Sequence, residues 1–141
     1  MGISDTSDIS VNVYQNEKWS NPNQMLSPGE GAVVYSQSES FVVSAVGTVL
    51  EGNLMNYVPA GSSLHSSMAP FNGLLSTSLR LRPSPGDSVI KFQGDLLETF
   101  TFTEQGWSPS EPSARFNESF LIRAKSPFVW SYLFDLEYGL R

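Results

Sequence analysis

The sequence predicts an all-β fold, a two-sheet sandwich or squat barrel in which residues 1–141 form a single domain. Apolar residues recur at every second position far more often than at every third or fourth, which is the period of a half-buried strand. Gly or Pro interrupts most of the windows that a helix would need. Nine Phe, five Tyr and three Trp residues favour a packed core. A chain of this length buries roughly two thirds of its unfolded surface without metals or disulfides.

Seven segments have the period or composition of strands, with alternating apolar residues or runs rich in valine and aromatic residues. In chain order they are Ile9–Tyr14, Ala32–Tyr35, Ser40–Leu50, Val89–Gln93, Glu98–Thr103, Phe120–Ala124 and Phe128–Leu136. Turn-forming residues separate them, at 21–23, 27–29, 59–61, 83–87 and 108–112. Two stretches, Leu64–Met68 and Leu74–Leu79, fit either a short helix or a further strand. Residues 1–8 are predicted to be a flexible N-terminal tail.

One internal repeat is the most specific signal in the chain. A gapless match at an offset of 88 pairs residues 14–50 with 102–138. The matched pairs are Tyr14 with Phe102, Trp19 with Trp107, Ser20 with Ser108, Glu30 with Glu118, Val33 and Val34 with Leu121 and Ile122, Ser38 with Ser126, and Val46 with Phe134. Two such units, joined by 51–95, are predicted to share one core in a pseudo-symmetric sheet pair. The alternative is chance similarity between two hairpins.

Four sequence stretches resemble a β-rich module of uncharacterised exported proteins from environmental bacteria. They are Gly52–Pro70 (GNLMNYVPAGSSLHSSMAP), Gly86–Phe92 (GDSVIKF), Gly106–Pro112 (GWSPSEP) and Asn117–Phe120 (NESF). The resemblance covers roughly residues 26–134, and it implies a β architecture and an exported or surface setting. It supplies no activity and no catalytic residues. The chain departs from the pattern at Asn117, where the first copy has Gly29; Asn also tolerates a left-handed conformation, so the turn is expected to survive.

The charge distribution argues against nucleic acid as a partner. Charged residues make up 16% of the chain and the net charge is −6. Residues 1–70 contain Lys18 as their single lysine or arginine, against six acidic side chains. Phosphate binding needs a concentrated basic face. The short run 80–82, Arg-Leu-Arg, fits a solvated strand end better than a phosphate site.

The absence of cysteine excludes disulfides, thiolate metal sites and a cysteine nucleophile, but it leaves the redox compartment open. Met1 to Ser10 has neither a basic segment nor an apolar one, and no later apolar run approaches ~18 residues. The sequence therefore predicts neither a signal peptide nor membrane insertion within these residues. An exported protein would carry its signal elsewhere.

Catalytic patterns are weak. His65 lies among serines (Ser62-Ser63-Leu64-His65-Ser66-Ser67), but no Gly-x-Ser-x-Gly motif accompanies it. The repeat-related Glu30 and Glu118 fit a glycosidase pair, although their positions directly after turn residues favour a role as structural turn carboxylates. Asp5, Asp8, Asp87 and Asp95 form no calcium loop, and no nucleotide-binding loop is present, so we expect no metal and no cofactor.

The aromatic residues are the remaining candidates for binding. Trp19 and Trp107 lie beside turns, while Phe128, Trp130, Tyr132 and Phe134 form one stripe because strand side chains alternate between faces. Core packing is the default explanation for the stripe. We therefore expect a non-catalytic structural or protein-interaction module that associates with itself or with a protein partner. The alternatives are a polysaccharide-binding module that uses Trp19, Trp107 or Trp130 as a platform, and a small hydrolase.

Overall fold

The computed structural model describes residues 10–38, 40, 42, 47–137 and 139–140, and the predicted tail over 1–8 lies outside them. No helix is found among the described residues. The strands are β1 (Tyr14–Gln15), β2 (Lys18–Trp19), β3 (Gly52–Val58), β4 (Gly61–Ser66), β5 (Gly73–Leu74), β6 (Ser88–Gln93), β7 (Leu96–Thr103), β8 (Gly106–Ser108), β9 (Ser113–Ala114), β10 (Ser119–Ala124), β11 (Phe128–Asp135) and β12 (Gly139–Leu140).

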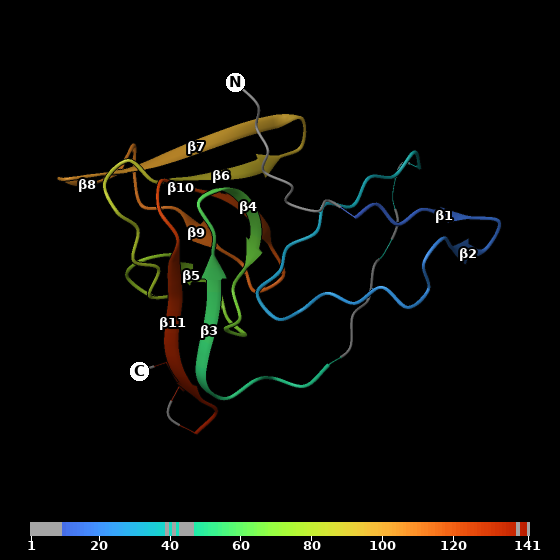
Figure 1. Ribbon diagram of the computed structural model, residues 1–141, viewed down its shortest axis with the longest axis horizontal. Coiled ribbons are helices and arrows are strands. Elements are labelled where there is room, and N and C mark those ends of the chain that lie inside the picture. Colours follow the sequence, from blue (N-terminus) through green and yellow to red (C-terminus); the bar gives the residue numbers. More distant parts are fainter. Residues whose placement is uncertain (1–9, 39, 41, 43–46, 138, 141) are drawn as a thin grey trace.

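The strands form a β-sandwich rather than a closed barrel (Figure 1). The larger sheet has the order β4-β10-β6-β7-β8, and the smaller sheet has the order β12-β11-β3. The pairs β1-β2 and β5-β9 lie outside these two sheets. All pairings are antiparallel, so short turns can connect successive strands. The all-β prediction is confirmed, with the sandwich as its form.

The smaller sheet shows how sequence alternation places the core. β3 and β11 pair in continuous register from Phe128 opposite Val58 to Phe134 opposite Gly52. The even-numbered residues of both strands face inward, and the odd-numbered Met55, Tyr57 and Val129 face solvent. The predicted aromatic stripe of β11 is therefore core, because period two places its whole set on one face.

Side chains from both sheets meet in one core. Trp130 is 1% exposed, and its ring centroid lies 6.2 Å from that of Phe120 on the opposite sheet. The indole N–H of Trp130 donates a 2.7 Å hydrogen bond to the Leu79 carbonyl, so its single polar group is satisfied. The loop after β5 adds Leu75, Leu79 and Leu81, all fully buried.

Four of the predicted strands are confirmed within one or two residues, as β6, β7, β10 and β11. The prediction is wrong for residues 10–13, for Ala32–Tyr35 and for the described residues of Ser40–Leu50, none of which belongs to a strand. Strands β3 and β4 were missed, since Asn and Ser interrupt their apolar pattern. The stretch 64–68 begins inside β4, whereas 74–79 begins with the last residue of β5 and continues as a turn over 75–79.

The internal repeat is not confirmed as a shared structural unit, although two local motifs do correspond. Tyr14 pairs with Trp19, and Phe102 pairs with Trp107, with ring centroids 5.2 and 5.3 Å apart. The turns at 27–30 and 115–118, each closed by a glutamate, correspond as well. The segments that follow them differ, since residues 120–124 form a central strand and residues 32–35 form none. The sequence match therefore reflects similar turns rather than two equivalent halves of the core.

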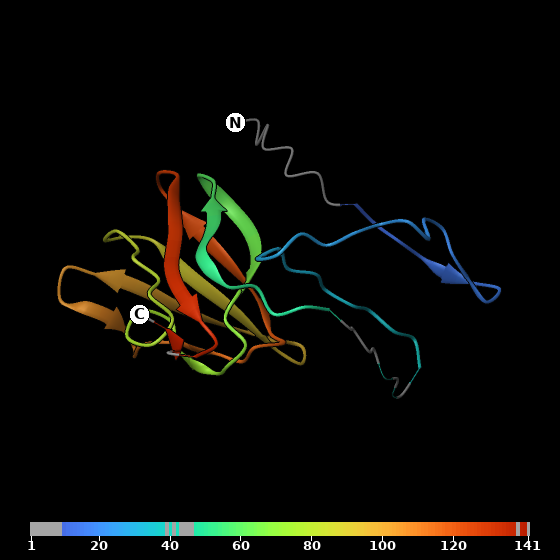
Figure 2. The ribbon, with the colours of Figure 1, turned by 90° about the horizontal axis from the view of Figure 1, so that it is seen from below.

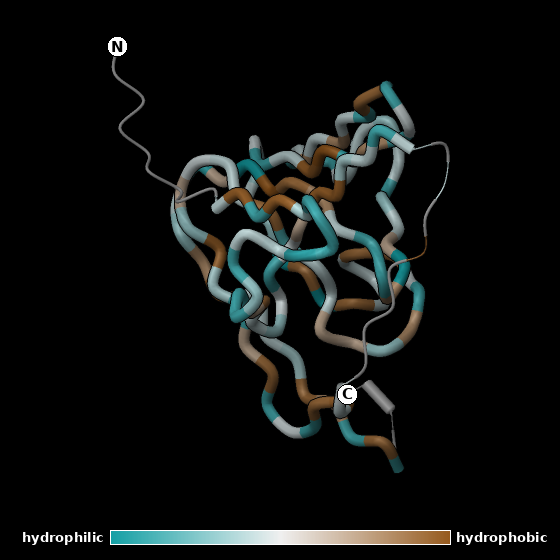
Figure 3. The backbone as a smooth tube through the Cα atoms, turned by 90° about the vertical axis from the view of Figure 1, so that its right-hand side faces the viewer, coloured by the Kyte–Doolittle hydropathy of each residue, from teal (hydrophilic) through white to brown (hydrophobic). Residues whose placement is uncertain are grey.

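The described residues between 10 and 50, which we name the arm, project away from the sandwich. Figures 1 and 2 show the blue and cyan chain leaving both sheets and carrying β1 and β2 at its far end. Figure 3, from the arm's side of the molecule, shows hydrophobic stretches on peripheral segments as well as in the centre. The arm is anchored near Gly29, where the Ser66 N–H donates a 3.0 Å hydrogen bond to the Gly29 carbonyl.

Candidate functional site

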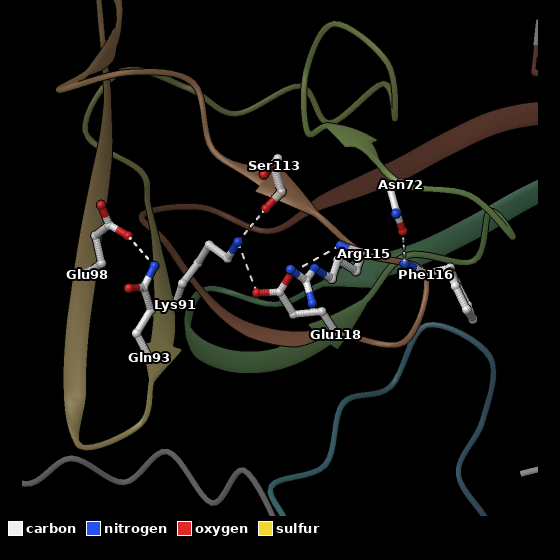
Figure 4. Close-up of polar contacts among 8 residues, drawn as sticks. All are labelled: Asn72, Lys91, Gln93, Glu98, Ser113, Arg115, Phe116 and Glu118. Atoms are coloured by element: carbon white, nitrogen blue, oxygen red, sulfur yellow. Dashed lines mark hydrogen bonds and ion pairs between the residues drawn. The ribbon is translucent and has the colours of Figure 1, made fainter. Parts of the chain in front are cut away.

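A polar hollow of about 490 Å³ lies at one end of the larger sheet, between β6 residues 91–93 and the segment 113–118 (Figure 4). The Lys91 ammonium group lies 2.9 Å from a Glu118 carboxylate oxygen and donates a 2.6 Å hydrogen bond to the Ser113 carbonyl. The Gln93 amide donates a 3.0 Å hydrogen bond to Glu98. The polar groups on the sheet side of this hollow are thus largely occupied by one another.

The two repeat-related glutamates fix their own turns. Glu118 accepts a 3.0 Å hydrogen bond from the Arg115 N–H, and Glu30 accepts a 2.7 Å hydrogen bond from the Ser27 N–H. In both turns the glutamate N–H also donates back to the carbonyl three residues earlier. A carboxylate that closes a turn in this way satisfies a backbone donor that the chain reversal leaves free. This arrangement matches the structural role that the sequence favours for both residues.

The hollow has little catalytic capacity. It contains no histidine and no serine hydroxyl in contact with a base, and its carboxylate, Glu118, is paired with Lys91. Its exposed cation is Arg115, a residue that the sequence did not single out. Acid–base chemistry needs a group free to exchange a proton with a ligand. The hollow is therefore better suited to holding a polar group than to transforming one.

His65 joins the two sheets through a buried hydrogen-bond network. The side chain is 4% exposed; Nδ1 lies 3.0 Å from Asn56 Oδ1, and Nε2 lies 2.7 Å from the Ser63 hydroxyl. The Asn56 amide group donates to the carbonyls of Gly29, at 3.3 Å, and Ser66, at 3.2 Å. Since an amide oxygen is only an acceptor, Nδ1 carries the proton and Nε2 accepts from Ser63.

Ser63, His65 and Asn56 are hydrogen-bonded in the order of a serine–histidine–acceptor triad, but the burial of His65 supports a structural role for the three residues. Burial lowers the pKa of His65 to about 4, which makes the imidazole a much weaker base than a free one. Asn56 uses its amide to connect strand β3 with the root of the arm and with β4. A Cβ atom at Gly29, where φ is +85°, would lie 2.6 Å from the Asn56 side chain. The network therefore fixes the arm where it meets the sandwich.

Two of the three tryptophans proposed as a binding platform are occupied in packing. Trp130 as a platform is wrong, because it is buried in the core. Trp107 packs against the core, and its indole N–H donates a 3.0 Å hydrogen bond to the Ser76 hydroxyl. Trp19 is 50% exposed at the far end of the arm, beside Tyr14. The flat multi-tryptophan surface that polysaccharide binding would use is not formed by these residues.

Most of the large apolar side chains that are exposed lie in two places, while others, including Leu96, Leu97 and Phe116, lie elsewhere. Along the arm they are Val11, Val13, Tyr14, Trp19, Met25, Leu26, Val33, Val34, Tyr35, Val42, Val49 and Leu50. On the outer face of the smaller sheet, Met55 and Tyr57 are each 63% exposed, and Val129 and Leu133 are about half exposed. Exposed apolar side chains that gather on one segment or one sheet face are typical of interaction sites in soluble proteins.

No family model, curated protein or solved structure matches the chain. Among the described residues, no helix has the length and apolar character needed to cross a bilayer. No cluster of three or more His, Asp and Glu side chains that could hold a metal ion is found in that part of the chain either.

Proposed function

We propose that the protein is a non-catalytic interaction module that associates with copies of itself through the arm. One observation carries this proposal: the arm exposes a dozen large apolar side chains while it projects away from the core. Tyr35 is 86% exposed and Met25 is 84% exposed. Full burial of a side chain of this size stabilises a protein by roughly 1.5–3 kcal/mol relative to leaving it in water. An arm of this composition is expected to be covered in the functional assembly.

The polar features of the molecule support the same proposal. The His65 network, the paired Glu118 and the turn carboxylate Glu30 all connect segments of the chain. Their hydrogen-bonding groups are used in holding the fold, which leaves the apolar surface as the main unexplained feature. The expected role is structural, as one unit of an assembly.

The test is the mass of the purified protein in solution. We expect light scattering after size exclusion to give a multiple of the 15.5 kDa monomer at about 100 µM, with dissociation on dilution. The thermal midpoint should then rise with protein concentration, because association stabilises the folded chain by mass action. A constant monomer mass and a concentration-independent midpoint would contradict the proposal.

A further inference from the structure

Strand β3 leaves one edge of the smaller sheet open. It spans seven residues and pairs on one side with β11, while no described residue pairs with its other side. Its sequence, GNLMNYV, contains no charged residue and no proline, and its register with β11 shows no bulge. Natural sheets protect their edges with charged residues, prolines or bulges, because an open edge offers a row of unpaired backbone groups to another chain. β3 is therefore an unprotected edge that can accept another strand.

The arm contains a segment that has the sequence of a strand but no strand partner. Residues 32–35, Ala-Val-Val-Tyr, are rich in the residue types that strands prefer. Within the described structure their backbone makes one hydrogen bond, from the Ala32 N–H to the Ser119 hydroxyl, 3.2 Å away. Val33, Val34 and Tyr35 are all more than half exposed. The segment has the composition of a strand but no strand partner among the residues that the structure describes.

We propose that residues 32–35 of one copy pair with the open edge of β3 in a second copy. The inference rests on the proposed self-association and names the surface that mediates it. Strand addition of this kind gains affinity from backbone hydrogen bonds and specificity from alternating side chains. In this pairing, apolar side chains of the arm cover Met55 and Tyr57 on the outer face of the sheet.

The uncharged composition of the two segments permits a second copy as the occupant despite its negative charge. Each chain carries a net charge of −6, so two copies repel each other unless the contact avoids their acidic groups. Neither residues 32–35 nor β3 contains a charged side chain. The two segments thus meet without burying an unpaired charge, which would oppose association.

A reciprocal contact enlarges the buried area. Val33, Val34 and Tyr35 on the arm and Met55 and Tyr57 on β3 are all more than half exposed. Two copies that exchange arms form the contact twice, which brings the buried area closer to that of stable interfaces. Two-fold exchange uses both surfaces of each copy, as closed dimers do.

The test uses one full-length variant for each surface. Val34→Asp places a charge in the arm segment, and Tyr57→Lys places one at the sheet edge, as natural edges have. The controls are Gln37→Asp, an exposed arm position outside 32–35, and Thr99→Lys on the exposed face of β7. Tryptophan emission from the buried Trp130 reports whether each variant is folded. We expect both interface variants to be monomers at about 100 µM, and both controls to keep the wild-type mass.

Mixing the two variants gives the decisive measurement. Val34→Asp keeps an intact edge and Tyr57→Lys keeps an intact arm, so an equimolar mixture retains one of the two contacts. At a concentration well above the one at which wild type associates, the mixture should form a complex of one copy of each, while neither variant alone does. A Tyr57→Lys protein that keeps the wild-type mass would overturn the β3 surface while leaving self-association standing. A mixture that stays monomeric would overturn the arm–edge pairing, and a monomeric wild type would overturn the proposed function as well.

Discussion

At the scale of single residues, the most informative group is the buried histidine. His65 was noticeable in the sequence as the single imidazole, and its serine neighbour at Ser63 shares its face because the two lie two positions apart on one strand. Its acceptor Asn56 could not be found this way, since it belongs to the opposite sheet and only the packing of β3 on β4 brings it close. Removing one member of such a network leaves a buried polar group without a hydrogen-bond partner, which lowers the stability of the folded protein.

The protonation of His65 predicts how stability depends on pH. Burial lowers its folded-state pKa to about 4 from 6.5, so the unfolded chain takes up a proton in the interval where the folded chain does not. The contribution to stability is complete above pH 6.5 and decreases as the pH falls toward 4, by about 3 kcal/mol at pH 4. Urea unfolding at several pH values measures this decrease.

The control is His65→Gln, which carries no titrating group. We expect the difference in unfolding free energy between wild type and variant to shrink as the pH falls from 6.5 to 4. Carboxylate titrations are common to both proteins and cancel in this difference. A difference that does not change with pH would show that His65 is protonated at its ordinary pKa in the folded protein.

At the scale of elements, the long loops are held by carboxylates rather than by further strands. Glu111 accepts hydrogen bonds from the backbone N–H groups of Ser76 and Thr77, at 2.7 and 2.6 Å, and from the Thr77 hydroxyl at 2.8 Å. Asp87, 2% exposed, accepts from the N–H groups of Ser84 and Lys125. Sequence analysis could predict the β6–β7 hairpin from its alternation, but the hydrogen bonds of Glu111 and the bond from Lys125 to Asp87 join residues more than thirty positions apart.

Replacing Glu111 by Ala should destabilise the fold by about 2 kcal/mol, because two backbone donors in the loop after β5 lose a charged acceptor. Glu111→Gln keeps one oxygen acceptor and should cost about half as much. The matched control is Glu104→Ala in the exposed β7–β8 turn, with an expected change within about 0.5 kcal/mol. Equal unfolding midpoints for Glu111→Ala and Glu104→Ala in urea would show that the loop does not depend on this anchor.

The strands that the sequence mispredicted follow a physical pattern. β3 and β4 contain polar Asn and Ser at inward positions, so they lack the apolar alternation that identified β6 or β11. Ala32–Tyr35 has the opposite character, with strand composition and no strand partner among the described residues. Local sequence reports what a segment prefers, while pairing depends on what lies beside it. Under the proposed arm exchange, this segment becomes a strand only in the assembly.

At the scale of the whole molecule, a two-sheet sandwich carries an arm with exposed apolar side chains, and the chain has a net negative charge. The sequence predicted the fold class from its period, its turns and its aromatic content, but it did not distinguish an arm from the body. That distinction depends on tertiary contacts: Val33 and Val89 have the same side chain, yet the first is 62% exposed and the second is 1% exposed. The exposed fraction of each valine therefore depends on how the two sheets pack, which the local sequence does not show.

The balance between apolar attraction and charge repulsion predicts how salt affects self-association. Each copy carries a net charge of −6, whereas the proposed contact between residues 32–35 and β3 contains no ion pair. Raising NaCl from about 20 mM to about 500 mM shortens the screening length from roughly 20 Å to below 5 Å and suppresses repulsion between copies. Apolar contacts are not screened, so sedimentation velocity should show tighter association at high salt. Weaker association at high salt would mean that ion pairs hold the copies together, and it would direct attention to the exposed Arg115 at the polar hollow instead of the arm.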